Sequence, residues 1–141
     1  MQLDDSVRFV GYMRRDGELQ DAYRAADLFV FSSRMETQWL VLIEALALGT
    51  PVVALGVMGT LDVLHEDGGC RIPADNPTAF SEAVHQVLAN RDLRAQLSAE
   101  AVAYGERWSS AEKSRTLIGL YEQLCARRTA EPPAQAATNP A

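Results

Sequence analysis

The sequence has 141 residues, of which 48% are hydrophobic and 23% charged, and its formal net charge is −6. This length allows one domain with a hydrophobic core and excludes two full-sized domains. The acidic balance argues against a nucleic-acid partner, because phosphate backbones are bound by clustered Lys and Arg, and the pairs Arg14-Arg15 and Arg127-Arg128 are too short to reverse it.

Short apolar runs alternate with segments of helical periodicity along the first half of the chain. The predicted strands are residues 7–10, 28–31, 51–55 and 69–72. The predicted helices between them are residues 18–26, 38–48 and 59–65. This alternation indicates an α/β fold, with a Rossmann-like and mainly parallel sheet flanked by helices.

The second half of the chain is predicted to be helical. Helical spacing continues through residues 77–89, 91–107 and 110–127, with turn and cap residues at Asp75-Asn76-Pro77 and Asn90. Residues 128–141 are rich in Ala and Pro without periodicity, and we expect them to be disordered. The predicted organisation is one domain over residues 1–127, with a helical C-terminus and a tail.

The two cysteines and the N-terminus favour a reducing compartment. Cys70 and Cys125 fit no metal-ligand spacing, and idle thiols are favoured over a disulfide, which stays open as the alternative. Residues 1–8 are polar and acidic, unlike a signal peptide. No stretch approaches the roughly 18 apolar residues of a membrane span. We therefore expect a cytoplasmic protein without a transmembrane segment.

Three loops are the places to look for a ligand site. In open parallel sheets, ligands bind outside the carboxyl ends of the strands. The loops predicted to lie there are residues 11–17, 32–38 and 56–59.

The helix predicted for residues 38–48 carries one charged residue in an apolar setting. From Trp39 to Leu48, Glu44 is the only residue that is not apolar. A buried carboxylate needs hydrogen-bond donors, and the hydroxyls of a ligand would supply them. The alternative is that Glu44 marks the solvent-facing stripe of the helix.

The start of the same helix is a second candidate feature. Its first amides have no partner within the helix, so a diphosphate could bind there without a basic side chain. Glu36 lies eight residues before Glu44, which would let the two acids hold opposite ends of an elongated ligand. The alternatives are that Thr37 or Gln38 only begins the helix, and that Glu36 only complements its dipole.

Several motifs together resemble the family 4 retaining glycosyltransferases, which have the two-domain GT-B fold. Members carry two Glu residues separated by seven positions, as Glu36 and Glu44 are here. The matching segments are residues 28–36, 40–45 and 49–54, with Phe9-Val10-Gly11 before them and residues 68–72, Trp108 and Tyr121 after them. The resemblance runs from about residue 7 to residue 124, nearly the whole predicted domain.

The resemblance implies a donor-binding C-terminal half of a GT-B enzyme, one that transfers a hexosyl group from a nucleotide-diphosphate sugar with retention and needs no metal or other cofactor. It implies no catalytic residue that can be named here. The implied contacts are Glu36, Thr37 and Gln38 with the donor sugar, the amides of Trp39, Leu40 and Val41 with the diphosphate, Glu44 with the ribose, and Tyr12 and Met13 near the base.

The sequence departs from the family at two points. Trp39 stands where relatives usually have Gly, so its indole either crowds the ligand or turns aside and packs. Relatives also have an N-terminal acceptor domain and two further strand–helix units before residue 7. We therefore expect a truncated donor domain with little or no activity alone. A non-catalytic nucleotide- or protein-binding module is the main alternative, and a nucleotide-sugar epimerase or a receiver domain fits less well.

The missing units raise a question about the sheet edge. In the family, their strands lie between the strands predicted at residues 7–10 and 28–31. Here those two strands are predicted either to pair directly or to leave an edge through which a homodimer forms, with a swap of strands as one version.

Overall fold

The computed structural model describes residues 6–35 and 39–130. The chain divides into two compact units, Met1–Glu106 and Arg107–Ala141, and each is described by itself. The first unit contains α1 (Glu18–Ala25), β1 (Phe29–Phe31), α2 (Leu40–Ala47), β2 (Val52–Ala54), α3 (Thr60–Val63), β3 (Cys70–Arg71), α4 (Pro77–Ala89) and α5 (Arg91–Glu106). The second contains α6 (Ser110–Ala130).

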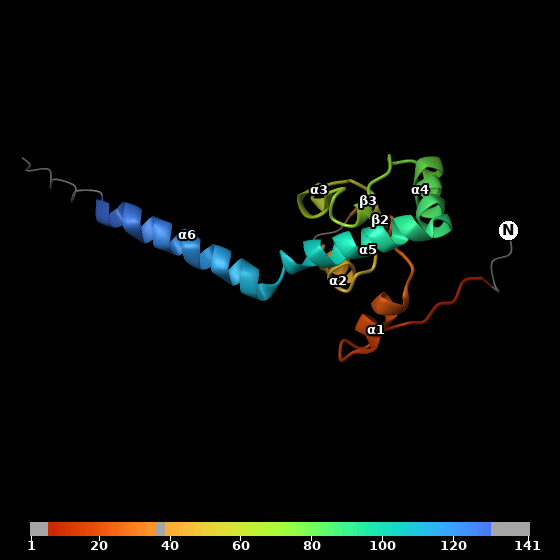
Figure 1. Cartoon of the computed structure of the whole chain (residues 1–141), viewed down its shortest axis with the longest axis horizontal. Helices are drawn as coiled ribbons and strands as arrows, with labels where there is room; N and C mark the ends of the chain where they lie inside the picture. The colour runs from red at the N-terminus through yellow and green to blue at the C-terminus, as the bar shows by residue number, and fades with distance from the viewer. Residues whose placement is uncertain (1–5, 36–38, 131–141) are drawn as a thin grey trace, which may run out of the picture. The chain divides into compact units, whose positions relative to one another are not determined.

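The strands form a parallel sheet in the order β1-β2-β3, which confirms the predicted α/β class. Phe29 pairs with Val52 in the β1–β2 ladder, and Val52 pairs with Cys70 in the β2–β3 ladder. The central strand β2 has no exposed residue, as a strand covered on both faces requires. Helices surround the sheet in Figure 1, where α4 lies beside β2, and Leu97 of α5 belongs to the same core cluster as Val53 of β2.

Helix α5 closes the end of the sheet at which the strands begin. Its Ser98 hydroxyl donates to the carbonyl of Gly49, 2.7 Å away, just before β2. A Cβ on Gly69, just before β3, would stand 2.5 Å from the backbone of Leu97 and Ala101. Since α5 fills this end, the loops that follow the strands at the opposite end are left to hold ligands.

The helix caps predicted after the sheet are confirmed. The Asn76 side chain accepts a hydrogen bond from the amide of Ala79 at 2.9 Å, and Pro77 occupies the first turn of α4, where its missing N–H leaves no helical bond unmade. Asn90 accepts from the amide of Leu93 at 3.0 Å in the same way. These caps place α4 and α5 so that Val87 and Leu97 pack with Val53 in one core cluster.

The strand predicted at residues 7–10 is absent, and direct pairing with β1 was a wrong prediction. Among the described residues, β1 pairs only with β2. Phe9 and Val10 are 95% and 59% exposed, and Figure 1 shows this segment, in red, running as coil towards α1. The physical reason is that no described element covers the outer side of the segment, so one short ladder would not offset the entropy of ordering it.

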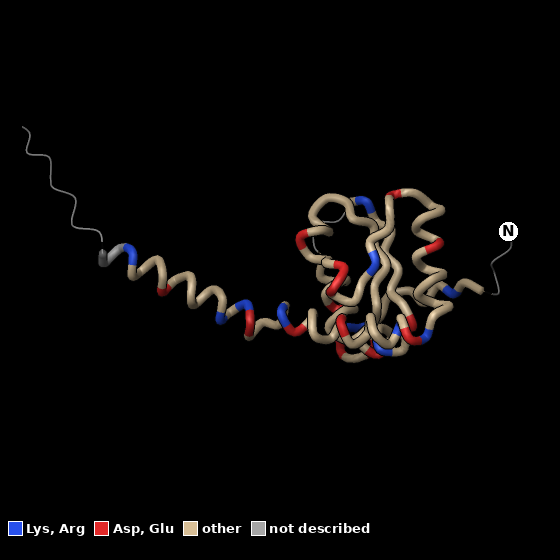
Figure 2. Tube along the Cα trace, turned by 45° about the horizontal axis from the view of Figure 1, so that its top comes forward, with Lys and Arg blue, Asp and Glu red and all other residues tan. Residues whose placement is uncertain are grey.

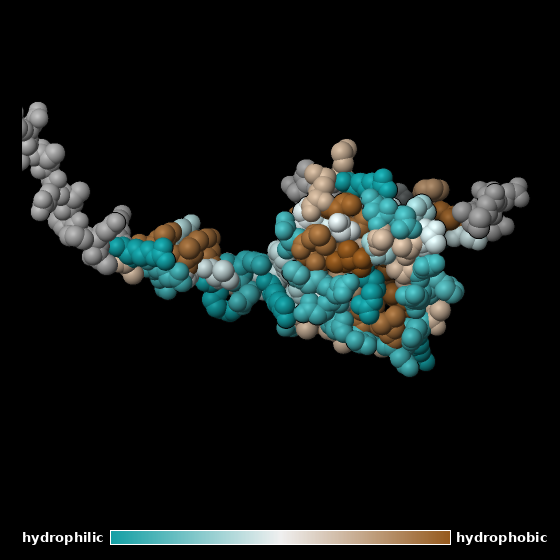
Figure 3. Space-filling model, turned by 90° about the horizontal axis from the view of Figure 1, so that it is seen from above, coloured by the Kyte–Doolittle hydropathy of each residue, from teal (hydrophilic) through white to brown (hydrophobic). Residues whose placement is uncertain are grey.

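Basic and acidic residues are mixed along the described chain. In Figure 2 the Lys and Arg positions are interspersed with Asp and Glu along the trace. Figure 3 shows apolar surface within a polar surround on the globular unit, and again along α6. None of the helices in residues 6–35 and 39–130 combines the length and the apolar content that a membrane crossing requires.

Cys70 is a buried thiol with no disulfide to Cys125. Its sulfur donates to the carbonyl of His65 at 3.0 Å, and burial raises its pKa to about 12. A thiol that stays protonated is a weak nucleophile, so the prediction of an idle Cys70 is supported.

The second unit consists mainly of α6, which runs to Ala130 and not to residue 127 as predicted. At its start, the Lys113 ammonium lies 3.9 Å from the centre of the Trp108 ring. Several apolar side chains of α6 are about half exposed, and their spacing places them on one broad face. They are Leu117, Ile118, Leu120, Tyr121 and Leu124.

Candidate functional site

Glu44 lies in the second turn of α2 and is partly accessible. Its neighbours along the helix, Leu42, Ala45 and Leu46, are fully buried and hold α2 in place. The Glu44 side chain itself is 30% exposed. Its Oε1 atom is in an ion pair, whereas its Oε2 atom is buried without a hydrogen-bond partner. The solvent-stripe interpretation therefore does not describe this carboxylate fully, because one oxygen is withdrawn from water and still lacks a donor.

Arg15 is the partner of the other oxygen. Its Nη1 atom donates to Oε1 of Glu44 at 2.7 Å, from the loop that precedes α1. The hydrogen bond and the charge of Glu44 raise the pKa of Arg15. The loop that carries Arg15 is fixed by its own contacts, since the Gln20 side chain accepts from the amide of Gly17 at 3.1 Å and donates to the carbonyl of Arg15 at 3.3 Å.

A cavity of about 210 Å³ adjoins Glu44 between α1 and α2. It is lined by Leu19, Gln20, Tyr23, Glu44, Ala47 and Leu48. Burial, and then the negative charge of Glu44, raise the pKa of Tyr23, so its hydroxyl stays protonated as a donor. The hydroxyl of Thr50 donates to the carbonyl of Tyr23 at 2.7 Å and thereby ties α1 to the turn after α2.

The amino end of α2 is formed by three of the predicted site residues. Trp39 is the residue before the helix, and Leu40 and Val41 are its first two residues. Among the described residues no side chain caps this end, and the first amides of a helix have no acceptor within it. The helix rises about 1.5 Å per residue, so Glu44 lies about 6 Å from Leu40 along the axis. An anion at this end and a hydroxyl group at Glu44 are therefore within the span of one ligand.

The indole of Trp39 lies against the loop that follows β2. A Cβ added to Gly59 would stand 3.0 Å from its Nε1 atom. The indole thus packs on a glycine whose missing side chain makes room for it, which favours the interpretation that Trp39 turns aside.

We therefore predict that Trp39→Gly leaves the affinity for nucleotides unchanged, because the indole already packs on Gly59. Calorimetric titration of the variant beside the wild-type chain measures this. A clear gain in affinity would instead support crowding of the ligand by the indole.

Other predicted site residues lie elsewhere or outside the described residues. Glu36, Thr37 and Gln38 fall in the segment that the structure does not describe, so their predicted sugar contacts are untested. Tyr12 is 87% exposed in the loop before α1. Met13, the other residue predicted near the base, is half-buried in that loop. Nothing in residues 6–35 and 39–130 forms a cluster of three or more His, Cys, Asp or Glu suited to a metal ion.

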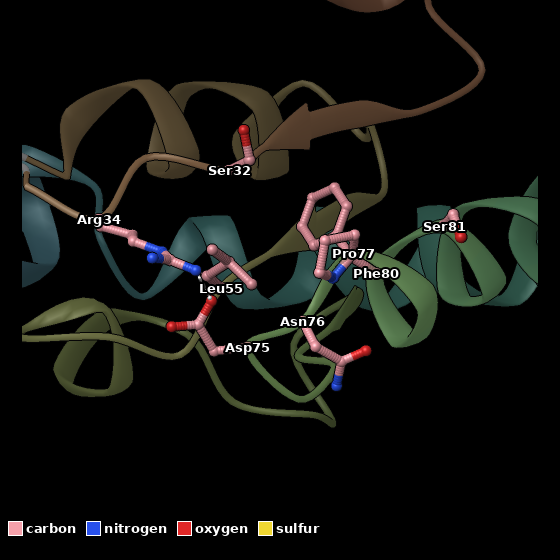
Figure 4. Close-up of a pocket in the computed structure, with 8 residues that line it drawn as sticks. All are labelled: Ser32, Arg34, Leu55, Asp75, Asn76, Pro77, Phe80 and Ser81. Atoms are coloured by element: carbon pink, nitrogen blue, oxygen red, sulfur yellow. Dashed lines mark hydrogen bonds and ion pairs between the residues drawn. The ribbon is translucent and has the colours of Figure 1, made fainter.

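A larger cavity, of about 340 Å³, lies at the ends of the strands (Figure 4). Leu55, Pro77 and Phe80 give it an apolar part, and Ser32 lies where β1 ends. The Arg34 Nη2 atom donates to Oδ1 of Asp75 at 2.8 Å, which joins the loop after β1 to the segment after β3. The carboxyl edge of the sheet is therefore hollowed, as the parallel order predicts.

Comparison with known proteins identifies the family of this α/β unit. A family model described as "Glycosyl transferases group 1" matches residues 1–90, more than half of the chain. The chain belongs to the group 1 glycosyltransferase family.

Similar proteins include two curated glycosyltransferases and one solved structure. The chain is 37% identical over 113 residues to a D-inositol 3-phosphate glycosyltransferase of Xylanimonas cellulosilytica. The aligned region covers 79% of the chain and 27% of that protein. The chain is 39% identical over 123 residues to the protein of the same name from Streptomyces bingchenggensis, covering 86% and 27%. Among solved structures, it superposes on sucrose-phosphate synthase from Thermosynechococcus elongatus with a TM-score of 0.71 and 30% identity, covering 89% of the chain and 32% of that structure.

The chain thus spans about a quarter to a third of the length of these relatives. This partial coverage fits the C-terminal domain of a GT-B glycosyltransferase, as the resemblance predicted.

Two features of this group 1 glycosyltransferase domain were missed from the sequence. Arg15 was noted only as part of a short basic pair, although it lies in a loop that was predicted to face a ligand. The Arg34–Asp75 ion pair spans 41 positions, so no local pattern could indicate it. The one available signal was that the loops at 11–17 and 32–38 each contain Arg.

Proposed function

We propose that this domain binds the nucleoside-diphosphate part of a sugar donor, for transfer of a hexosyl group with retention at the anomeric carbon. The observation that carries the proposal is Glu44, one turn into α2, which lines a cavity and has a buried Oε2 atom without a donor. Ribose hydroxyls are suitable donors for a carboxylate.

The parts of the donor are assigned along α2. Glu44 takes the ribose, and the amides of Trp39, Leu40 and Val41 take the diphosphate, which the helix dipole favours. Tyr12 and Met13 lie near the base, and Glu36, Thr37 and Gln38 take the sugar. No metal or other cofactor is needed in this scheme, because the backbone amides at the amino end of α2 supply the partial positive charge that a diphosphate requires. We also propose that the protein is cytoplasmic.

Calorimetric titration of uridine, guanosine and adenosine diphosphates into the chain tests the proposal. We expect one of them to bind. If all three are silent, at protein concentrations that would reveal millimolar binding, the donor-site proposal is wrong.

Efficient turnover is expected to need a separate acceptor domain. The named relatives are three to four times longer than the matched part, and a cleft between two domains cannot form from one of them. The half-exposed apolar face of α6 is a surface that such a domain could cover, since exposed apolar stripes mark interaction sites. We propose that the chain alone has little or no transferase activity.

A non-catalytic module is the second candidate function. The Arg15–Glu44 ion pair favours it, because one carboxylate oxygen of Glu44, the residue predicted to bind ribose, is already bonded to Arg15. In that case the cavity beside Glu44 would bind neither nucleotide nor sugar, and the domain would bind a protein partner. A folded chain that binds none of the three nucleoside diphosphates in the titration is the result that favours this candidate.

The open edge of β1 is proposed as a homodimer contact. β1 has one paired side among the described residues, and Val30 in this strand is 45% exposed. An unpaired apolar edge promotes association with another strand.

We predict that sedimentation shows a concentration-dependent dimer, and that Val30→Lys shifts it towards monomer because charge opposes edge pairing. Val102→Lys, a charge added on an exposed position of α5, is the control. A strict monomer at every concentration would contradict the contact.

A further inference from the structure

Arg15 is paired with Glu44, which lies about one helical turn along α2 from the amides proposed to hold an anion. It is joined to Glu44 Oε1 at 2.7 Å, although its side chain is 60% exposed and has other directions available to it. Two contacts of Gln20, with the amide of Gly17 and with the carbonyl of Arg15, hold its loop in this position. The arrangement is therefore supported by more than one flexible side chain.

The acid of this pair presents an electrostatic conflict for the proposed ligand. The backbone of Glu44 lies about 6 Å along α2 from that of Leu40, whose amide would help to hold a diphosphate, and the Glu44 side chain carries a negative charge. At that distance like charges repel appreciably near a protein surface. A carboxylate that accepts ribose hydroxyls would thus weaken the binding of the phosphates attached to the same ribose.

We infer that Arg15 is a nucleotide-binding residue, which neutralises Glu44 so that a single site can take both ribose hydroxyls and a diphosphate. The inference rests on the proposed function and deepens it. Oε1 keeps its bond to Arg15 and Oε2, the oxygen without a donor, receives the hydroxyl. The ligand class is therefore a nucleoside carrying two or more phosphates, and the selectivity for phosphate comes from the Arg15–Glu44 pair acting with the α2 amides.

Arg14 is a matched control in the next position. Its side chain is 72% exposed and pairs with Asp16 and Glu18 and not with Glu44. The variants Arg15→Gln and Arg14→Gln remove one positive charge each, from adjacent residues of one loop. Any effect of net charge alone is therefore the same in both. Arg15→Lys keeps a positive charge beside Glu44 but replaces the guanidinium with an ammonium group.

The experiment titrates the full chain with the nucleoside diphosphate that binds it, among the uridine, guanosine and adenosine forms, and with the matching nucleoside. We expect Arg15→Gln to weaken the diphosphate about 10-fold relative to wild type and the nucleoside less than 3-fold, with a smaller difference at high salt. Arg14→Gln should leave the ratio of the two affinities unchanged, and Arg15→Lys should restore most of it.

The outcomes separate this inference from the proposed function. If a diphosphate binds, Glu44→Ala weakens that binding and Arg15→Gln behaves like Arg14→Gln, the role of Arg15 is overturned while the donor site stands. Stronger diphosphate binding by Arg15→Gln also overturns it, since Arg15 would then compete with the ligand. If no diphosphate binds either the wild-type chain or Arg15→Gln, both the site and the role of Arg15 are rejected.

Discussion

Replacing Gly69 with Ala is expected to destabilise the domain by about 3 kcal/mol, the sum of backbone strain and overpacking. Gly69 has a φ of +79°, a conformation that residues with a side chain rarely adopt. Its Cβ would stand 2.5 Å from the amide nitrogen of Ala101 and from the carbonyl oxygen of Leu97. Both neighbours are backbone atoms of α5, so they cannot move aside by changing a rotamer.

Urea unfolding followed by circular dichroism measures this effect. Gly11→Ala is the control, because Gly11 also has positive φ, at +71°, but nothing lies within 4 Å of its added Cβ. The control isolates the cost of the backbone conformation, which is about 1 kcal/mol. Equal unfolding midpoints for the two variants would show that α5 does not pack on the strand ends as described. A typical domain is stable by about 5–15 kcal/mol, so the expected loss is a large share of the total.

The order of strands and helices could be predicted because it depends on local sequence patterns, namely apolar runs, helical periodicity and cap residues. The apolar run that contains β2 begins at Pro51, and the periodic segment of α4 begins at the Asn76-Pro77 cap. The structure has a strand and a helix at these places. Parallel order then implied a hollow at the carboxyl edge, which the cavity beside Arg34 and Asp75 confirms. Local periodicity and caps sufficed for these features since each depends on residues close in sequence.

The strand predicted at residues 7–10 shows what local pattern cannot decide. Phe9 and Val10 have the composition of a strand, but a strand also needs a neighbour to bond and an element to cover it. The open edge of β1 is available as a neighbour, but no element of the described chain covers the segment, and Phe9 is 95% exposed. The pattern is therefore compatible with a strand in a larger sheet without specifying one here.

The candidate site was predicted in part for a similar reason. Glu44 stood out because it is a charged residue within an apolar helix, and the structure places it beside a cavity. Its partner Arg15 is 29 positions away in a loop, and the packing of α1 on α2 brings the two together. A contact of that kind depends on tertiary structure, so the sequence pattern identified Glu44 and missed its partner Arg15.

Replacing Glu44 with Ala is expected to weaken nucleoside-diphosphate binding about 10- to 100-fold, since hydrogen bonds to a charged group contribute about 1.5–3 kcal/mol. The variant removes the acceptor that the structure leaves without a donor at Oε2. Folding should be retained, because the Glu44 side chain is partly exposed and its ion pair involves an exposed Arg15. Glu82→Ala, which removes an exposed acid from α4, is the control for net charge.

Comparison of ribose with deoxyribose ligands shows whether Glu44 acts on the hydroxyls themselves. The wild-type chain should prefer the ribonucleoside diphosphate to its 2′-deoxy form, because the deoxy ligand leaves a carboxylate oxygen without a donor. Glu44→Ala should bind the two forms equally, since it has lost the group that tells them apart. An unchanged preference in Glu44→Ala would assign the ribose to another residue and leave Glu44 a structural partner of Arg15.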